Sequence, residues 1–189
     1  MSDFDFDAAL RWAKFDPGRT LARRADNELP FIGEIAEAGQ ELLLDTCVYI
    51  DGLQGRAPVI VADLLDIRQS NHSTIAIQEL MHTAGVLDPA HTGTKTAVEQ
   101  IRTTVKAMPS YRVFAPDADV LGRAALLSGM LCRLQGYQRD ARLRALHDCV
   151  LFLQAQKLGF TVLTANVSDF DYLLQLIPTS RVLFYRSNN

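Results

Sequence analysis

One short segment, residues 42–51, constrains the fold of this chain more than any other. It reads Leu-Leu-Leu-Asp-Thr-Cys-Val-Tyr-Ile-Asp, an apolar run that stops at an acid before apolar residues resume at roughly helical spacing. This pattern predicts a buried strand at 42–44 with a helix directly after it. Asp45 would then lie at the carboxyl end of a strand, where open α/β sheets bind their ligands. A plainer explanation is that Asp45 only caps the helix.

The rest of the chain continues this alternation of strands and helices. Further strands are predicted at 74–77, 111–114, 160–163 and 181–185, and helices at 46–54, 59–68, 78–85, 92–106, 117–134, 139–158 and 170–177. No hairpin signal of the Asn-Gly type separates the strands, so the pattern favours a parallel sheet with helices on both faces.

A leader of residues 1–40 precedes the first strand. Short helices are predicted in it at 7–15 and 19–27, on either side of the breaker Pro17-Gly18. We expect the leader to pack on the main domain, residues 41–189, or to contact a partner.

Composition and charge exclude several classes of protein. No apolar run approaches the roughly 20 residues that span a bilayer, and the acidic first residues are unlike a signal peptide. The three cysteines form no CxxC pair and indicate reduced thiols in a cytoplasmic protein. The four histidines lack the usual zinc spacings. A net charge of −3 does not support nonspecific coating of nucleic acid, although it leaves room for a local basic strip.

Three acids lie at or just beyond predicted strand ends. Glu79 repeats the pattern of Asp45, because it opens a helix after the strand predicted at 74–77. Asp169 ends the polar loop 164–169, which leaves a strand at the same edge of the sheet. Plainer explanations are a favourable charge near a helix N-terminus for Glu79, and a cap made by Asp169 or Ser168.

The fourth acid, Asp148, lies inside the helix predicted at 139–158, on a largely apolar face. A lone buried carboxylate is costly unless it is paired or bound to a metal. A plainer explanation is an ion pair with Arg144, four residues earlier, but such an exposed pair stabilises a helix by only a few tenths of a kcal/mol.

Carboxylates brought together in this way would repel one another. The usual resolution is a hard divalent cation held by oxygen ligands, Mg²⁺ or Mn²⁺. Such an ion lowers the pKa of a bound water and binds phosphate oxygens during an in-line attack. The four acids therefore point to phosphodiester hydrolysis.

Three segments match a known family: LLLDTCVYID, STIAIQELMHTAG and LHDCVLFLQAQKLGFTVLTANVSDFDYL. The third is the most specific, with an acid in a helix, Gly eleven positions later, a strand, and then Thr-x-Asn-x-x-Asp-Phe. From about Leu42 to Tyr185 the chain resembles the PIN-domain ribonucleases, and most closely the VapC-type toxins of toxin–antitoxin pairs.

This resemblance implies a PIN-like three-layer α/β/α fold with a central parallel sheet, preceded here by a short helical leader. It implies a metal-dependent endoribonuclease that acts on RNA, is inhibited by a cognate antitoxin and forms a homodimer. The implied metal-binding and catalytic acids are Asp45, Glu79, Asp148 and Asp169, with Asp45 and Asp148 the firmest ligands. Thr46, Thr164 and Asn166 would support them by orienting ligands or water.

The chain departs from the family in two respects. Many relatives carry Asp at the position of Asn166, so either Asn166 or Asp169 completes the site, and we assign Asp169. The leader is also extra, because compact members of the family begin near the first strand.

Five arginines gather around the two long helices and suit the recognition of RNA phosphates. They are Arg123, Arg133, Arg139, Arg142 and Arg144. A plainer explanation for each is a solvated helix face.

Two other functions remain alternatives. One is a catalytically silent PIN-like module that binds nucleic acid or protein. The other is a phosphatase with Asp45 as its nucleophile, similar to the haloacid-dehalogenase-like enzymes, but Cys47 stands where those enzymes have a second Asp.

Overall fold

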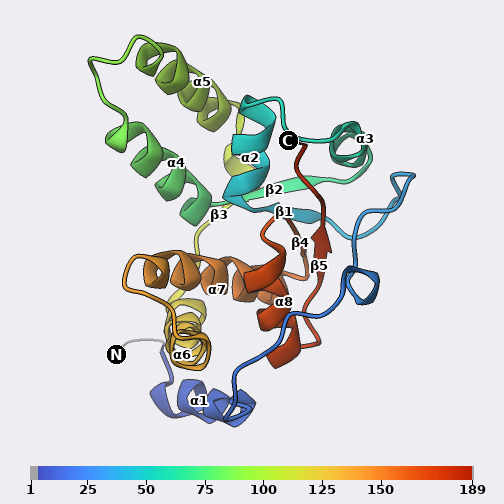
Figure 1. The fold of residues 1–189 in the computed structure, drawn as a ribbon, viewed down its shortest axis with the longest axis vertical. Helices are drawn as coiled ribbons and strands as arrows, with labels where there is room; N and C mark the ends of the chain where they lie inside the picture. Colours follow the sequence, from blue (N-terminus) through green and yellow to red (C-terminus); the bar gives the residue numbers. More distant parts are fainter. Residues whose placement is uncertain (1–3, 189) are drawn as a thin grey trace.

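The apolar run at Leu42–Leu44 forms β1, the central strand of a five-stranded sheet in the computed structural model, which describes residues 4–188. The strand order is β3-β2-β1-β4-β5, and every neighbouring pair is parallel (Figure 1). Parallel strands need long crossover connections, and most of those between these strands contain helices.

The elements follow one another along the chain with short connections. In order they are α1 (Phe6–Leu10), η1 (Arg11–Phe15), η2 (Asp26–Glu28), β1 (Leu42–Leu44), α2 (Thr46–Leu53), α3 (Val59–Ile67), β2 (Ser70–Ser73), α4 (Thr74–Val86), α5 (Thr94–Ala107), η3 (Ser110–Arg112), β3 (Val113–Phe114), α6 (Ala118–Gln135), α7 (Ala141–Leu158), β4 (Thr161–Thr164), α8 (Val167–Leu176) and β5 (Val182–Phe184).

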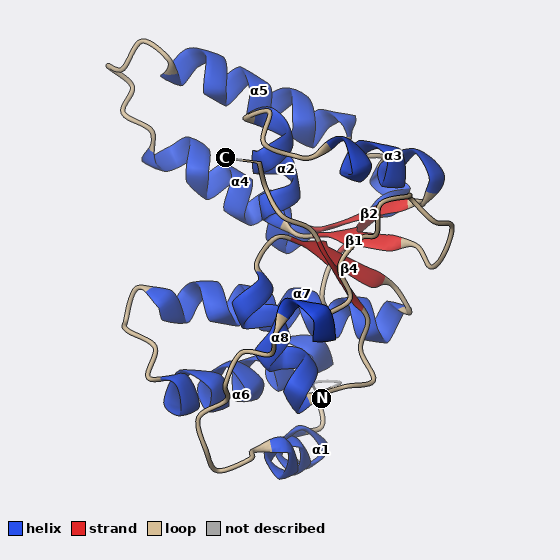
Figure 2. Cartoon of the chain, turned by 45° about the vertical axis from the view of Figure 1, so that its right-hand side comes forward, coloured by secondary structure: helices blue, strands red, loops and turns tan. Residues whose placement is uncertain are grey.

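Helices cover both faces of the sheet, and the strand residues alternate between two cores. Leu43 points into a core shared with α6, α7 and α8, whereas Leu42 and Leu44 point into a core shared with α2, α3, α4 and α5. Figure 2 shows the sheet between these two helical layers. The predicted three-layer α/β/α fold with a central parallel sheet is therefore confirmed. Within residues 4–188, no helix is both long and apolar enough to cross a membrane.

The second strand lies four residues earlier than predicted, because its polar side chains find partners inside the fold. β2 is Ser70–Ser73, and the β-branched run at 74–77 instead opens α4. Asn71 donates to the carbonyl of Leu42 at 3.1 Å. The Ser73 hydroxyl donates to Gln154 at 2.7 Å and also accepts from the amide of Ile75, which caps α4. These bonds outweigh local β-propensity.

The leader packs on the domain, with α1 lying beside α6 (Figure 1). The helix predicted at 7–15 appears as α1 followed by η1, but the helix predicted at 19–27 is wrong except for η2. Residues 20–25 are not helical, because their polar groups bond to α6 and α8 rather than to one another. Residues 1–3 of the leader and Asn189 lie outside the described part of the chain.

Candidate functional site

Asp45 and Thr164 meet where two neighbouring strands end. Asp45 follows β1, and Thr164 is the last residue of β4, which pairs with β1. The Thr164 hydroxyl donates to Asp45 Oδ2 at 2.5 Å, and the Cys47 thiol donates to the same oxygen at 3.1 Å. Asp45 occupies the N-cap position of α2 but makes no capping hydrogen bond through its side chain. The plainer capping role therefore does not account for this buried carboxylate.

Asn166 joins the acids of two helices. Its amide nitrogen donates to Asp148 Oδ2 of α7 at 3.1 Å and to Asp169 Oδ2 of α8 at 3.0 Å. Its side-chain oxygen accepts from the amide of Asp169 at 3.5 Å, so Asn166 is the N-cap of α8. The predicted cap by Asp169 or Ser168 is wrong, and α8 begins earlier than expected, at Val167. This position, held by Asp in many relatives, thus contributes an amide donor between two carboxylates.

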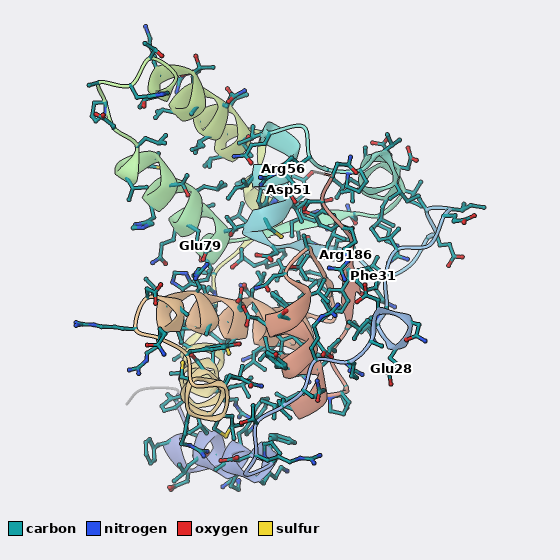
Figure 3. The ribbon with its side chains drawn as sticks, viewed as in Figure 1. Glu28, Phe31, Asp51, Arg56, Glu79 and Arg186 are labelled. Carbon is teal, nitrogen blue, oxygen red and sulfur yellow. The ribbon has the colours of Figure 1, made fainter. Side chains whose placement is uncertain are left out.

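Glu79 links three helices at the same site. It is the sixth residue of α4, in the second turn of the helix rather than at its opening as predicted. Its Oε1 lies 2.7 Å from His147 Nδ1 of α7, and its Oε2 accepts the hydroxyl of Thr46 of α2. Figure 3 shows Glu79 on α4 in the region that faces α7.

The four acids share one electrostatic environment. The pKa of Asp148 is raised well above its ordinary value, first by burial and then by the negative charges of Asp45, Asp169 and Glu79. Burial also raises the pKa of Asp45, although the Thr164 hydrogen bond opposes that shift. For Glu79, burial acts in the same direction, but its bonds to His147 and Thr46 hold its pKa below the ordinary value. The acids predicted from distant segments are thus brought together, with Asp45 and Asp148 under the greatest strain from their charge.

Two of the four carboxylates turn both oxygens toward protein donors. Both oxygens of Glu79 are engaged, and Asp169 accepts from the Tyr137 hydroxyl on Oδ1 and from Asn166 on Oδ2. Side-chain donors reach only Oδ2 of Asp45 and of Asp148. Among residues 4–188, no three His, Cys, Asp or Glu side chains are arranged to hold a metal ion together.

The chemistry of this donor set fits a hard divalent cation, because it consists of carboxylate oxygens in a low-dielectric site. The orientations of Glu79 and Asp169 do not yet converge on a shared point. Metal ligation by all four acids stays a prediction, and the open oxygens favour Asp45 and Asp148 as ligands.

Sequence reasoning missed three side chains at the site: Tyr137, His147 and Cys47. His147 immediately precedes Asp148, but the histidines were considered only for zinc spacings. Tyr137 follows Gly136, which ends α6 in the left-handed conformation with φ 64°. Adjacency to Asp148 and to a helix-ending glycine were the available signals, and neither specifies which carboxylate the side chain contacts.

The five predicted RNA-binding arginines separate into two groups. Arg123 pairs with Asp119 and stacks on Trp12, and Arg133 pairs with Asp16. Arg142 donates to the carbonyl of Tyr137 at 3.3 Å, which leaves the rest of its exposed guanidinium open.

Arg139 and Arg144 are exposed and form no ion pair among the residues that the structure describes. The plainer Arg144–Asp148 pair is therefore absent from this part of the chain. Burial raises the pKa of Asp148, and the positive charge of Arg144 opposes that shift. Arg144 thus lies close enough to the acids to affect a group bound there.

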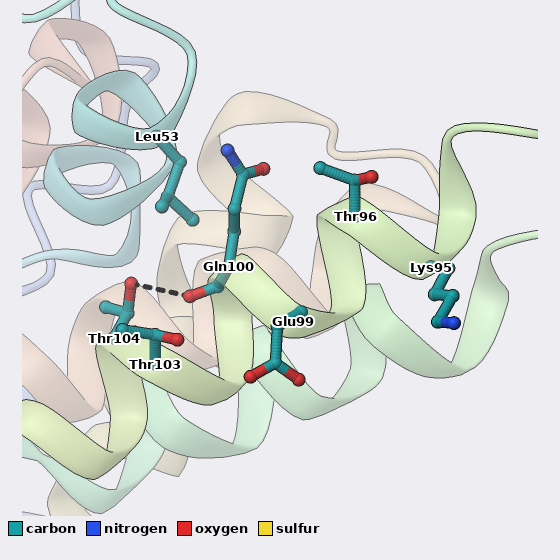
Figure 4. A pocket seen from close by; sticks show the side chains of 7 residues that line it. All are labelled: Leu53, Lys95, Thr96, Glu99, Gln100, Thr103 and Thr104. Atoms are coloured by element: carbon teal, nitrogen blue, oxygen red, sulfur yellow. Dashed lines mark hydrogen bonds between the residues drawn. The ribbon is translucent and has the colours of Figure 1, made fainter.

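A separate surface hollow of about 470 Å³ runs along α5 beside Leu53 (Figure 4). Its walls are mostly threonine, glutamine and lysine side chains, with Glu99 as its one carboxylate. None of the four clustered acids lines it, so we place the candidate chemistry at the sheet edge instead.

No protein-family model matches the chain, and no curated protein matches its sequence. Sixteen chains of solved structures are similar to it. FitAcB from Neisseria gonorrhoeae has a TM-score of 0.54 at 18% identity, over 76% of this chain and 96% of that chain. VapBC2 from Rickettsia felis, bound to a DNA fragment from its promoter, has a TM-score of 0.52 at 12% identity, over 76% and 98%.

A toxin–antitoxin complex from Klebsiella pneumoniae has a TM-score of 0.50 at 19% identity, over 77% of this chain and 99% of that chain. Identities this low show the fold and not the activity. The similarities confirm the PIN-like architecture, and they support the resemblance to VapC-type toxins at the level of the fold.

Proposed function

We propose that the protein is a metal-dependent endoribonuclease of the VapC type, which hydrolyses RNA phosphodiester bonds at the acid site. The gathering of Asp45, Glu79, Asp148 and Asp169 around Thr164 and Asn166 is the observation that supports this proposal most. Gathering four carboxylates is costly, and it has a clear use if a divalent cation relieves their repulsion. The similarity to solved toxin–antitoxin structures agrees with it.

The chain's own residues would divide the work. Asp45 and Asp148 would hold Mg²⁺ or Mn²⁺ through their open oxygens, with Glu79 and Asp169 completing the site directly or through water. When bound, the ion makes a water nucleophilic and neutralises charge on the phosphate. Thr164 and Thr46 fix Asp45 and Glu79, and Asn166 fixes Asp148 and Asp169. Arg144 and Arg139 would bind phosphates of the RNA beside the acids.

The partners follow from the same proposal. We propose a cognate antitoxin that inhibits the enzyme, a homodimer as the active assembly and a cytoplasmic location. The similar solved chain from Klebsiella pneumoniae belongs to a toxin–antitoxin complex, which supports the first of these.

A catalytically silent binding module is the second candidate, and one observation favours it. Glu79 and Asp169 are fully engaged with protein donors, so no three-ligand metal group is formed in residues 4–188. In this case the acids would serve only to tie helices together.

One experiment separates the two candidates. Purified wild-type protein should cleave RNA with Mn²⁺ or Mg²⁺ and not with a chelator, and Asp148→Asn should reduce the rate by at least about a thousandfold. Asp63→Asn, which removes an exposed acid of α3, is the matched control and should cleave normally. Equal cleavage by wild type and Asp148→Asn would refute the assignment. A folded wild-type protein that cleaves no RNA would favour the binding module.

A further inference from the structure

Tyr137 lies in the turn between α6 and α7 and reaches one of the four acids. Its hydroxyl donates to Asp169 Oδ1, and its ring packs against the core beneath α6, α7 and α8. Its backbone amide donates to the carbonyl of Cys132 at 3.1 Å, so the position of Tyr137 depends on how α6 ends. Asn166 holds the other oxygen of Asp169. Tyr137 and Asn166 together therefore fix the orientation of this carboxylate.

The leader binds the end of α6 that precedes Tyr137. The Thr20 hydroxyl donates to the carbonyl of Leu134 at 2.9 Å. The Gln135 side chain donates to the carbonyl of Leu21 at 3.2 Å. Both α6 residues stand within three positions of Tyr137, so the leader restrains the last turn of the helix.

The same short segment is anchored to α8, the helix that carries Asp169. Arg24 donates to the carboxylate of Asp171 through its amide at 2.8 Å and through Nε at 2.6 Å. Asp171 is fully buried, at 0% exposure. Gln175 of α8 also donates to the carbonyl of Ala22 at 3.0 Å. Residues 20–24 therefore bridge the end of α6 and α8, the two elements that must stay in register for Tyr137 to reach Asp169.

We infer that Tyr137 is a positioning residue for Asp169, and that leader residues 20–24 hold it in place. The inference rests on the proposed nuclease function and gives the leader a role in the acid site. The three solved structures named above match only 76–77% of this chain, so about a quarter of it lies outside that shared fold. Groups that orient metal ligands from outside typically change metal affinity by about 10- to 100-fold when removed.

The first test removes the hydroxyl and keeps the ring. Tyr137→Phe should weaken Mn²⁺ binding by about tenfold, measured by calorimetry, and raise the Mn²⁺ concentration for half-maximal cleavage by a similar factor. At saturating Mn²⁺, cleavage should recover most of its rate, which loss of a merely structural contact would not produce. Tyr172→Phe is the matched control, because Tyr172 is a half-buried tyrosine of α8 whose hydroxyl has no hydrogen bond within residues 4–188.

The second test loosens the leader without touching the buried Arg24–Asp171 pair. Thr20→Val combined with Gln135→Met removes the two bonds to the end of α6. This double variant should also weaken Mn²⁺ binding, and it should add little further loss when combined with Tyr137→Phe, because the two changes act through one contact. Fully additive losses would overturn the link between the leader and Tyr137.

A third measurement needs no metal. In the metal-free protein, the double variant should increase amide hydrogen exchange at Tyr137 and its neighbours in the turn; unchanged exchange would also overturn that link. Wild-type Mn²⁺ affinity in Tyr137→Phe would overturn the positioning role and leave the proposed function intact. If wild-type protein bound no Mn²⁺, the proposed function and the positioning role would fall together.

Discussion

The site contains two kinds of carboxylate, and the contrast between them is informative. Glu79 and Asp169 are held on both oxygens by protein donors, whereas Asp45 and Asp148 keep an oxygen that no side-chain donor reaches within residues 4–188. The first pair ties helices to one another, and the second pair bears the cost of gathered charge. The difference teaches that four acids in one place need not be four equivalent ligands. We expect the open pair to respond most strongly to a cation.

The contrast is tested most severely by comparing one acid of each kind. Asp45→Asn should reduce RNA cleavage by at least about a thousandfold, because it removes a carboxylate with an open oxygen. Glu79→Gln should reduce it by only about tenfold, since glutamine can still bond to Thr46 and His147. Rates measured on one RNA at saturating Mn²⁺ provide the comparison. Equal losses in the two variants would show that all four acids act as equivalent ligands.

The stability of the metal-free protein gives a smaller effect of the opposite sign. Asp148→Asn should raise the free energy of unfolding at pH 7 by at least about 1.4 kcal/mol, the equivalent of one pKa unit. The sign follows from the raised pKa of Asp148, which is caused first by burial: charging this group disfavours the folded state. The native carboxyl should therefore lose stability as the pH rises above about 4, the ordinary pKa of Asp.

Denaturant titrations at several pH values measure this gain. Near pH 4 and below, where Asp148 is protonated in both states, the gain from Asp148→Asn should disappear. The side-chain oxygen of the substituted residue can still accept the amide of Asn166, so the hydrogen bond itself is not lost. A variant less stable than wild type at pH 7 would show that the Asp148 charge is already compensated without a cation.

The arginines extend the contrast and give the smallest effect. Arg144→Gln should weaken RNA binding severalfold and lower the slope of log affinity against log salt by about 0.7, the value for one phosphate contact on a single strand. Arg133→Gln should leave both unchanged, because Arg133 is already paired with Asp16. Binding isotherms of an Asp148→Asn background at three salt concentrations avoid cleavage during the measurement. Equal slopes for both arginine variants would contradict the division.

Much of the fold could be predicted because its signals are local. The apolar run before Asp45 marks β1, and Gly136 and Gly159 mark helix ends in the left-handed conformation that glycine adopts readily. β2 could not be found in this way. Its buried residues are polar, and they are satisfied by partners as distant as Gln154, so local propensity favoured the wrong segment.

The candidate site shows the same division. Asp45, Asp148 and Asp169 stand in segments with a recognisable pattern, so both the residues and their shared edge were predictable. The contacts of His147 with Glu79 and of Tyr137 with Asp169 join residues 68 and 32 positions apart. Side-chain pairings over such separations depend on how helices pack on the sheet, and no short motif encodes them.

The leader also makes a parallel bridge to the last strand, between Phe31 and Phe184. The amide of Ile32 donates to the carbonyl of Phe184 at 2.8 Å, and the amide of Phe184 donates to the carbonyl of Pro30 at 2.9 Å. Arg186 lies over the Phe31 ring (Figure 3). An uncovered strand border is a template for self-association, so a version shortened to residue 40 would expose β5 to other copies. Insolubility of such a truncated protein would then reflect this unguarded border and not damage to its chemistry.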